Sequence, residues 1–456
     1  MSARKTNSPE NHHRKNQTML SQLLFLAILG TASFFFAKRI AVIRRNILSG
    51  IDWDGSDRKA ERWKTMALVA LGQSKMTARP VAGVMHIIVY AGFVIINIEM
   101  LEIVIDGLFG THRIFAFLGG FYNVLIASFE WLAAGVIVAC VVFFIRRNGM
   151  ALARLTSKDL QGWPSLDANI ILVAEVVLMF AFLSMNAADA IAQSRGLPHY
   201  TAAGSFPVSS LLIPLYSGLT DVGVIAVERG MWWAHIVGVL SFLVYVPYSK
   251  HFHIILAFPN TYFSNLNAPA AMDNMEAVTK EVQLMMDPSA DPFAAAPADA
   301  IPPKFGAKDA PDLTWKQLME AYTCTECGRC TSECPANQTG KLLSPRKIMM
   351  STRDRMEEIG AAREANGGEW KPDGKSLLGD WITEEELWAC TSCQACVEAC
   401  PINISPMGII LDMRRSLIME DSKSPESITS MFNNIENNGA PWAFPAGDRG
   451  NWTNEV

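Results

Sequence analysis

Two short stretches decide how this chain is organised: residues 324–335 read CTECGRCTSECP, and residues 390–401 read CTSCQACVEACP. Both follow the pattern C-x2-C-x2-C-x3-C-P, the spacing with which proteins hold cubane [4Fe–4S] clusters. In two-cluster proteins, three thiolates of one loop bind a cluster and the fourth ligand comes from the other loop. The sequence therefore predicts two ligand sets, which are Cys324, Cys327, Cys330 and Cys400 for one cluster, and Cys390, Cys393, Cys396 and Cys334 for the other.

The alternative occupant of such cysteines is zinc. Zinc favours two separated cysteine pairs around one tetrahedral ion, whereas here four cysteines crowd into each short stretch and a proline follows the last. Eight of the nine cysteines lie in these stretches, which excludes a scattered disulfide framework and indicates metal binding in a reducing compartment. The ninth, Cys140, lies in an apolar run and is expected to be a small buried hydrophobic residue.

The composition indicates that part of the chain lies in a membrane. Of the 456 residues, 50% are hydrophobic and only 18% are charged, and the mean hydropathy is +0.18; soluble domains carry about 25% charged residues. The net charge of −5 gives no basic footprint for nucleic acid. Runs long enough to cross a hydrocarbon layer of roughly 30 Å occur at about 19–37, 81–108, 119–145, 168–192 and 231–258.

Basic residues predict the orientation of these spans. The connection from Lys38 to Arg79 holds ten Lys or Arg residues, and the connection after the third span adds Arg146, Arg147, Arg154 and Lys158. Because positive loops stay in the cytoplasm, we expect a multi-pass protein of the prokaryotic inner (cytoplasmic) membrane, with its N-terminus outside and everything after Lys250 in the cytoplasm. The stretch 204–227, interrupted by two prolines, is expected to be a surface or re-entrant segment on the outer side.

Histidines near the membrane are the next candidate ligands. Polar groups in lipid are costly and usually functional, and histidine is the common axial ligand of haem. His86 and His253 are expected at the cytoplasmic ends of the antiparallel second and fifth spans, where they would bind haem b between them. On a continuous helix His251 points about 200° away from His253, so it is expected to be an interface residue.

His235 lies 18 residues, or five helical turns, before His253. It is a candidate ligand of a second haem, although the second span offers no clear partner at its level. A structural role, satisfied by hydrogen bonds, is the alternative for one or both of His86 and His253. Carboxylates within the spans indicate either a proton route that serves quinone chemistry or contacts between helices; they are Glu99, Glu102, Asp106, Glu130, Glu175 and Asp189.

The fold expected from these features is mainly α, a five-helix transmembrane bundle of cytochrome b type followed by an α-helical, two-[4Fe–4S] ferredoxin-like domain. The predicted divisions are a polar tail (1–18), the transmembrane haem b and quinone domain (19–258), a linker rich in Ala, Pro and Asp (259–311), the cluster domain (312–420) and a C-terminal tail (421–456).

Two parts of the chain resemble known families. Residues 232–254, WWAHIVGVLSFLVYVPYSKHFHI, resemble the haem-bearing helix of the nitrate reductase gamma subunit and heterodisulfide reductase cytochrome family, and His86 with the following Tyr90-Ala91-Gly92-Phe93 fits the same family. The segments TWKQ (314–317), CPANQTGKLLSPR (334–346) and LWACTSCQACVEACP (387–401) are similar to the iron–sulfur domain of heterodisulfide-reductase-like Fe–S oxidoreductases. Together the resemblance covers about residues 80–420.

The resemblance implies a membrane subunit that passes electrons between a cytoplasmic oxidoreductase and the (mena)quinone pool, with Lys250 and Tyr90 as candidate quinone contacts. Many members of the Fe–S family continue into cysteine-rich CCG domains, for which no cysteine remains here. It therefore implies a separate CCG-type (heterodisulfide-reductase-like) subunit or an electron-transferring flavoprotein as partner. Two alternatives remain: a membrane-tethered docking or assembly subunit without haem, and a stand-alone enzyme that reduces a disulfide or an organic acid.

Overall fold

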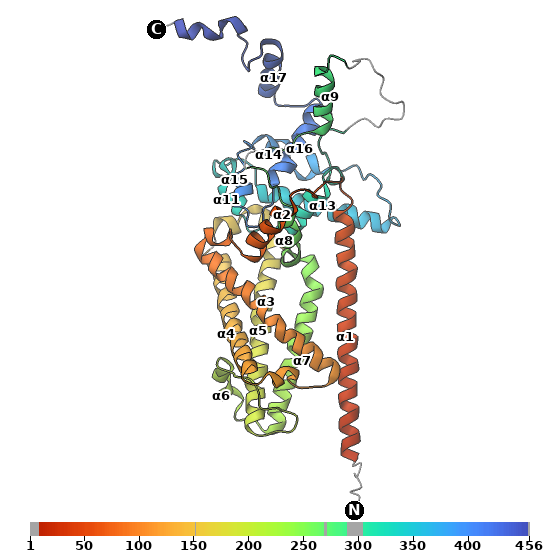
Figure 1. Cartoon of the computed structure of the whole chain (residues 1–456), viewed down its shortest axis with the longest axis vertical. Helices are drawn as coiled ribbons and strands as arrows, with labels where there is room; N and C mark the ends of the chain where they lie inside the picture. Colours follow the sequence, from red (N-terminus) through yellow and green to blue (C-terminus); the bar gives the residue numbers. More distant parts are fainter. Residues whose placement is uncertain (1–8, 151, 269–270, 290–303, 455–456) are drawn as a thin grey trace, which may run out of the picture.

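The computed structural model describes residues 9–150, 152–268, 271–289 and 304–454. Within these residues the chain is helical, without strands and with two isolated β-bridges. Figure 1 shows a bundle of long helices, a domain of short helices packed at one end of it, and a C-terminal segment that extends away from that domain. The predicted mainly-α fold is confirmed.

Five helices are long and apolar enough to cross a membrane, as predicted. They are α1 (Pro9–Ile47), α3 (Pro80–Phe109), α4 (Gly120–Phe144), α5 (Trp163–Ser194) and α7 (Asp221–Tyr245), and together they are called the membrane bundle below. Helix α1 packs against α3 and α7, while Leu23, Leu26, Phe34 and Phe35 on its surface stay exposed. Exposed apolar side chains of this kind suit contact with lipid.

The fifth span differs from its prediction. Helix α7 begins at Asp221 because Thr220 caps it, with its side chain accepting a hydrogen bond from the Gly223 amide. It ends at Tyr245 because Pro247 has no amide hydrogen and its ring clashes with the preceding turn. Two short 3₁₀ turns follow, and α8 (His253–Tyr262) starts a new direction. The expected continuous helix over 231–258 is therefore wrong.

The stretch 204–227 is divided between two structures. Its first part forms a short 3₁₀ turn (Ser209–Leu212) and helix α6 (Ile213–Tyr216), whereas residues from Asp221 onward form the first turns of α7. It adds no sixth candidate membrane helix among the described residues.

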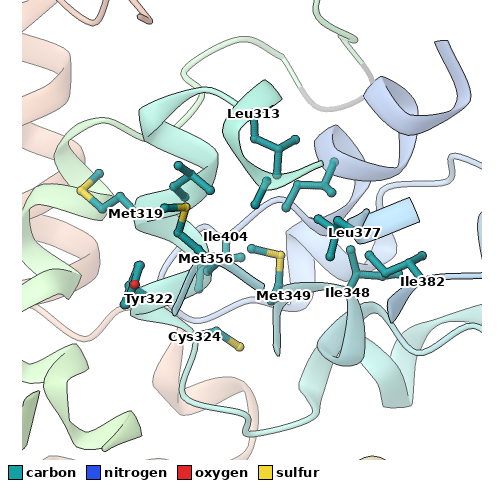
Figure 2. Close-up of a cluster of buried hydrophobic side chains, with 14 of the residues drawn as sticks. Leu313, Met319, Tyr322, Cys324, Ile348, Met349, Met356, Leu377, Ile382 and Ile404 are labelled. Carbon is teal, nitrogen blue, oxygen red and sulfur yellow. The ribbon is translucent and has the colours of Figure 1, made fainter. Parts of the chain in front are cut away.

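Residues 304–420, called the cysteine domain below, fold as seven helices around one core. They are α10 (Trp315–Thr323), α11 (Arg329–Glu333), α12 (Pro335–Gln338), α13 (Pro345–Ala365), α14 (Glu384–Trp388), α15 (Ala395–Ala399) and α16 (Pro406–Met419). Capping boxes at Thr314 with Gln317 and at Thr383 with Glu386 begin two of them. Figure 2 shows part of the core, where Met319, Tyr322 and Cys324 of one segment face Ile348, Met349 and Met356 of α13.

This core continues into the membrane bundle. The same buried cluster that forms the core of the cysteine domain includes Ile43 and Ile47 of α1, Phe252 just before α8, and Leu256 within α8. Asn260 is fully buried, and its amide donates to the Ile402 carbonyl at 2.7 Å. The bundle end that bears these contacts is called the domain-side end, and the opposite end the far end. The cysteine domain is thus packed directly on the bundle.

The remaining segments connect these parts. Helix α2 (Lys59–Met66) follows α1 and precedes α3 along the chain. Helix α9 (Glu276–Met286) lies within the predicted linker, of which residues 269–270 and 290–303 fall outside the described residues. Because α8 extends to Tyr262 and is packed on the cysteine domain, the linker begins later than predicted. Helix α17 (Glu426–Asn438) forms part of the tail and has no buried residue. At the other end, α1 already begins at Pro9, inside the predicted polar tail.

Candidate functional site

The two cysteine loops have the same backbone design. The first cysteine loop (324–334) runs from α10 into α11, and the second (390–400) follows α14 and runs into α15. Each carries two residues with left-handed φ at matching places, Glu326 (56°) and Gly328 (71°) in the first and Ser392 (55°) and Gln394 (61°) in the second. Such residues curl a chain tightly, which lets successive thiols face one interior. Helices α11 and α15 then pack against each other.

The predicted ligand sets come together across the two loops. Cys324, Cys327 and Cys330 line one small cavity with Cys400 from the second loop, and Cys396 also reaches its wall. In addition to its burial, the charges of three nearby thiols raise the pKa of Cys396, and these thiols are those of Cys390, Cys334 and Cys393. The structure thus brings Cys400 beside the first loop and Cys334 beside the second, and the exchange of the fourth ligand stays a prediction.

The donor set fits cubane clusters better than a single ion. No group of three or more His, Cys, Asp or Glu side chains in the described part of the chain is arranged to hold one metal ion. A cubane spreads its ligands farther apart, because each thiolate binds a different iron. Backbone amides of Ser392 and Ile404 lie 3.4 Å and 3.3 Å from the sulfurs of Cys390 and Cys400, and such N–H···S contacts tune iron–sulfur sites. Burial raises the pKa of the Cys324 thiol to about 12, so iron binding must displace its proton.

The first cysteine loop is held by the membrane bundle. The Arg154 guanidinium, from the connection between α4 and α5, donates to the Cys327 carbonyl at 2.7 Å. Arg329 of α11 donates to the Lys75 carbonyl at 2.9 Å, and Arg79 donates to Glu333 at 2.8 Å. The second loop carries an exposed cysteine, Cys393, whereas every cysteine of the first loop is buried or half-buried.

His86 and His253 meet at the domain-side end of the bundle. His86 lies near the start of α3 and His253 at the first residue of α8. Their ring centroids are 6.3 Å apart with an interplanar angle of 43°. Nδ1 of His253 lies 3.1 Å from the Lys250 carbonyl, so that nitrogen carries the proton and Nε2 keeps its lone pair. Nδ1 of His86 is buried without a protein partner.

His251 belongs to the same group of rings. Its centroid lies 5.6 Å from that of His253 and 5.4 Å from Phe242, and burial together with the neighbouring imidazoles lowers its pKa to about 3. The expectation that it points away from His253 assumed a continuous helix. The turn Lys250–Phe252 breaks that helix and brings the two rings together.

His235 occupies a different place. It lies on α7, is 2% exposed, and its ring packs against Phe182 of α5 at 6.0 Å. Because α7 ends at Tyr245, His235 and His253 do not share one helix face, so the 18-residue spacing does not relate them. Among the described residues, no other histidine ring packs beside His235.

Of the two candidate quinone contacts, Lys250 is engaged in structural contacts. Its amine donates to the Pro164 carbonyl at 2.6 Å, pairs with Glu326, and lies 3.8 Å from Asp167. Tyr90 is half-buried, one turn beyond His86 on α3.

Most of the membrane carboxylates serve helix contacts at the far end. Glu102 accepts from the Tyr122 hydroxyl at 2.7 Å, Glu130 accepts from the Asn186 amide at 3.2 Å, and Asp189 accepts from Arg113 at 2.6 Å. A cavity of about 800 Å³ opens beside them, lined by acids, His112, His199 and two tryptophans. Glu99 lines it with one buried oxygen that has no partner. Glu175, on α5, is not among the residues that line this cavity.

One residue with a clear role escaped sequence reasoning. Glu326 of the first cysteine loop is 4% exposed and pairs with both Lys250 and Arg353. The signal was the difference between CTEC and CTSC, because the second loop has Ser392 where the first has this carboxylate.

Comparison with known proteins agrees with this site. Residues 320–404 match the 4Fe-4S dicluster domain. The chain is 28% identical over 462 residues to the probable iron-sulfur-binding oxidoreductase FadF of Bacillus subtilis, a match that covers 95% of this chain and 61% of that protein. It is 25% identical over 429 residues to the EtfAB:quinone oxidoreductase of Syntrophomonas wolfei, covering 88% of this chain and 55% of that protein.

A third relative matches a shorter part of the chain. It is one subunit of the ferredoxin/F(420)H(2)-dependent CoB-CoM heterodisulfide reductase of Methanosarcina acetivorans, 28% identical over 109 residues, which cover 24% of this chain and 53% of that protein. No solved structure is recognisably similar to the chain. The chain spans less than two thirds of the length of the first two relatives. The similarities support an iron–sulfur protein with a role in electron transfer.

Proposed function

We propose that this chain is a membrane electron-transfer subunit that links a cytoplasmic oxidoreductase to the quinone pool through two [4Fe–4S] clusters and haem b. The observation that carries the proposal is the pair of imidazoles of His86 and His253. Two imidazoles that bind opposite faces of one iron have centroids about 6 Å apart, since each metal–nitrogen bond is about 2 Å long. The observed separation is 6.3 Å.

The surroundings of the pair fit haem ligation. A ligating histidine usually donates its second ring nitrogen to a carbonyl, as His253 does to Lys250. The unpartnered Nδ1 of His86 is a buried polar atom, which calls for a ligand or a further partner. Haem b supplies one-electron chemistry at this position, while the protein holds its ligands and excludes water.

The arrangement of the cysteine loops supports an order for the cofactors. The first loop contacts the bundle and, through Glu326, the Lys250 segment that leads to His253. The second loop carries the exposed Cys393. We therefore assign the second loop to the partner side and the first to the membrane side. The relatives favour an electron-transferring flavoprotein or a heterodisulfide-reductase-type subunit as that partner.

The proposed position of quinone and the proposed orientation of the chain in the membrane rest on the same arrangement. We place quinone near the histidine pair, with Tyr90 as a contact and without Lys250, whose amine is already engaged. The basic residues at the domain-side end support an orientation with the cysteine domain in the cytoplasm and the N-terminus outside.

The test is a reduced-minus-oxidised optical spectrum with pyridine-haemochrome, iron and sulfide assays on the purified full chain. We expect about eight irons in clusters and an α-band of haem b that His86→Ala or His253→Ala abolishes. His235→Ala is the matched control, a buried histidine of the same bundle that should leave this haem in place. A wild-type protein with full cluster iron and no haem would refute the proposal and favour a docking or assembly subunit.

A further inference from the structure

We propose that the buried ion pair between Lys250 and Glu326 positions the first cysteine loop against the His253 segment, and sets the electrostatic environment of His253. Lys250 and Glu326 act here as positioning residues. The inference rests on the proposed function, because it assigns these residues a role toward the cofactors of the two sites.

The first step is where Glu326 lies. It stands between the ligands Cys324 and Cys327, in a left-handed conformation that a non-glycine residue rarely adopts. Its carboxylate is 3% exposed, and its two oxygens pair with Lys250 and, at 2.9 Å, with Arg353 of α13. A buried charge is tolerated when it is paired and hydrogen-bonded. Glu326 therefore ties the ligand loop to a residue outside the cysteine domain.

The second step is what Lys250 joins. Its amine also donates to the Pro164 carbonyl at 2.6 Å, and its backbone amide donates to Asp167 at 3.2 Å, both at the start of α5. Its backbone carbonyl lies 3.1 Å from Nδ1 of His253. One residue thus contacts the ligand loop, the membrane bundle and the histidine. A hydrogen bond of this kind fixes the ring orientation and the basicity of a ligating histidine.

The third step is an internal comparison within the chain. The second cysteine loop has the same φ at Ser392 (55°) as the first has at Glu326 (56°). The fold of a ligand loop therefore does not require a carboxylate at this place. Only the loop that faces the membrane bundle carries one, and its partner is the lysine three residues before His253. The comparison therefore indicates that the Glu326 carboxylate serves the docking of the first loop on the bundle and is not needed to form the loop.

The two single variants have opposite expected effects. Lys250→Met removes a positive charge near His253 and leaves Glu326 paired with Arg353 alone. The environment of His253 then becomes more negative, which stabilises oxidised iron and lowers the haem midpoint potential. Glu326→Ser gives the first loop the residue that the second loop already has. It removes a negative charge beside Lys250, which keeps only its weaker contacts with Asp167 and Pro164, and therefore raises that potential. In both variants, the reduction of haem through the clusters slows, because the contact that holds the first cysteine loop against the His253 segment is lost. A merely structural loss would move both potentials in one direction.

The experiment is a redox titration and a stopped-flow reduction of the full-length protein in detergent, followed at the haem α-band, with cluster signals followed by electron paramagnetic resonance. Iron content checks that each variant keeps its clusters. Lys75→Met is the matched control, because Lys75 and Glu398 form another ion pair between bundle and cysteine domain, which is exposed and 3.9 Å long. We expect this control to match the wild type.

The outcomes separate the two proposals. Opposite potential shifts with slowed reduction support the inference. Wild-type potentials and rates in both variants, or shifts of the same sign, overturn it while the proposed function stands. A wild-type protein that contains no haem overturns both.

Discussion

The docking of the cysteine domain can be tested at Arg346, which clamps the connection between α4 and α5 onto the first cysteine loop. Its side chain is fully buried, and Nε and Nη2 donate to Asp159 at 3.0 Å and 2.7 Å. Nη1 donates to the Arg154 carbonyl at 2.6 Å, and a further contact joins Nη2 to Ser157. The perturbation is Arg346→Met, which keeps much of the volume and removes every one of these donors.

The magnitude follows from the burial of the pair. Removing one partner of a buried ion pair costs about 3–5 kcal/mol, and Asp159 keeps 12% exposure, so we take the lower end. A loss of about 3 kcal/mol raises the open population of residues 152–162 by roughly 150-fold, because 1.4 kcal/mol is a factor of ten. Burial alone would raise the pKa of Asp159, but Arg346 holds this pKa below its usual value. The pKa of Asp159 should therefore rise in the variant.

The assay is amide hydrogen exchange by mass spectrometry on the detergent-solubilised protein. Exchange rates of protected amides report the open population, so peptides over 152–162 should exchange roughly 150-fold faster in Arg346→Met. Lys158→Met is the control, because Lys158 is exposed in the same connection and its loss should leave exchange unchanged. An acceleration below roughly fivefold, equivalent to about 1 kcal/mol, would refute the view that Arg346 holds this contact.

Three further predictions concern the cysteine domain. Cys400→Ser should change the same electron paramagnetic resonance signal as Cys327→Ser, because both sulfurs line one cavity; a change shared with Cys334→Ser instead would refute the exchange of the fourth ligand. Arg355→Lys should destabilise the protein by about 2–3 kcal/mol, seen as a lower thermal midpoint by tryptophan fluorescence. The reason is that lysine cannot bridge Asp309 and Asp373 while it also stacks on Trp370 and Trp381. An unchanged midpoint would contradict this. Gly50→Ala should lower the thermal stability, because the added Cβ would lie 2.5 Å from the Leu313 carbonyl oxygen and loosen the contact between the end of α1 and α10. Gly30→Ala is the control and should be neutral, because no atom lies within 4 Å of its added Cβ. Equal effects of the two substitutions would exclude this explanation.

The parts of the fold that could be predicted are those with local causes. The five apolar runs produce five membrane helices because each needs only enough consecutive apolar residues to cross a lipid layer. The end of the fifth helix was missed for the opposite reason. The apolar run continues past Pro247, so composition alone favours one helix, while the proline imposes a break that hydropathy does not register.

The histidines show the same division. The pairing of His86 with His253 was predicted from the level of each residue in antiparallel spans, and the rings do lie 6.3 Å apart. The place of His251 was wrong, because helical angles hold only on a continuous helix. The membrane carboxylates could be read either way from sequence, and their contacts with Arg113, Tyr122 and Asn186 come from packing between distant helices.

By itself the sequence determined the cofactor chemistry of the cysteine domain, because the spacing of cysteines within one short loop is a local property that decides which metal centre can bind. Only the tertiary structure decided how that domain is coupled to the membrane bundle. Lys250 and Glu326 are 76 positions apart, and no periodicity links them. Their contact exists because the membrane bundle and the cysteine domain pack together. Burial then requires each of the two charges to have a partner.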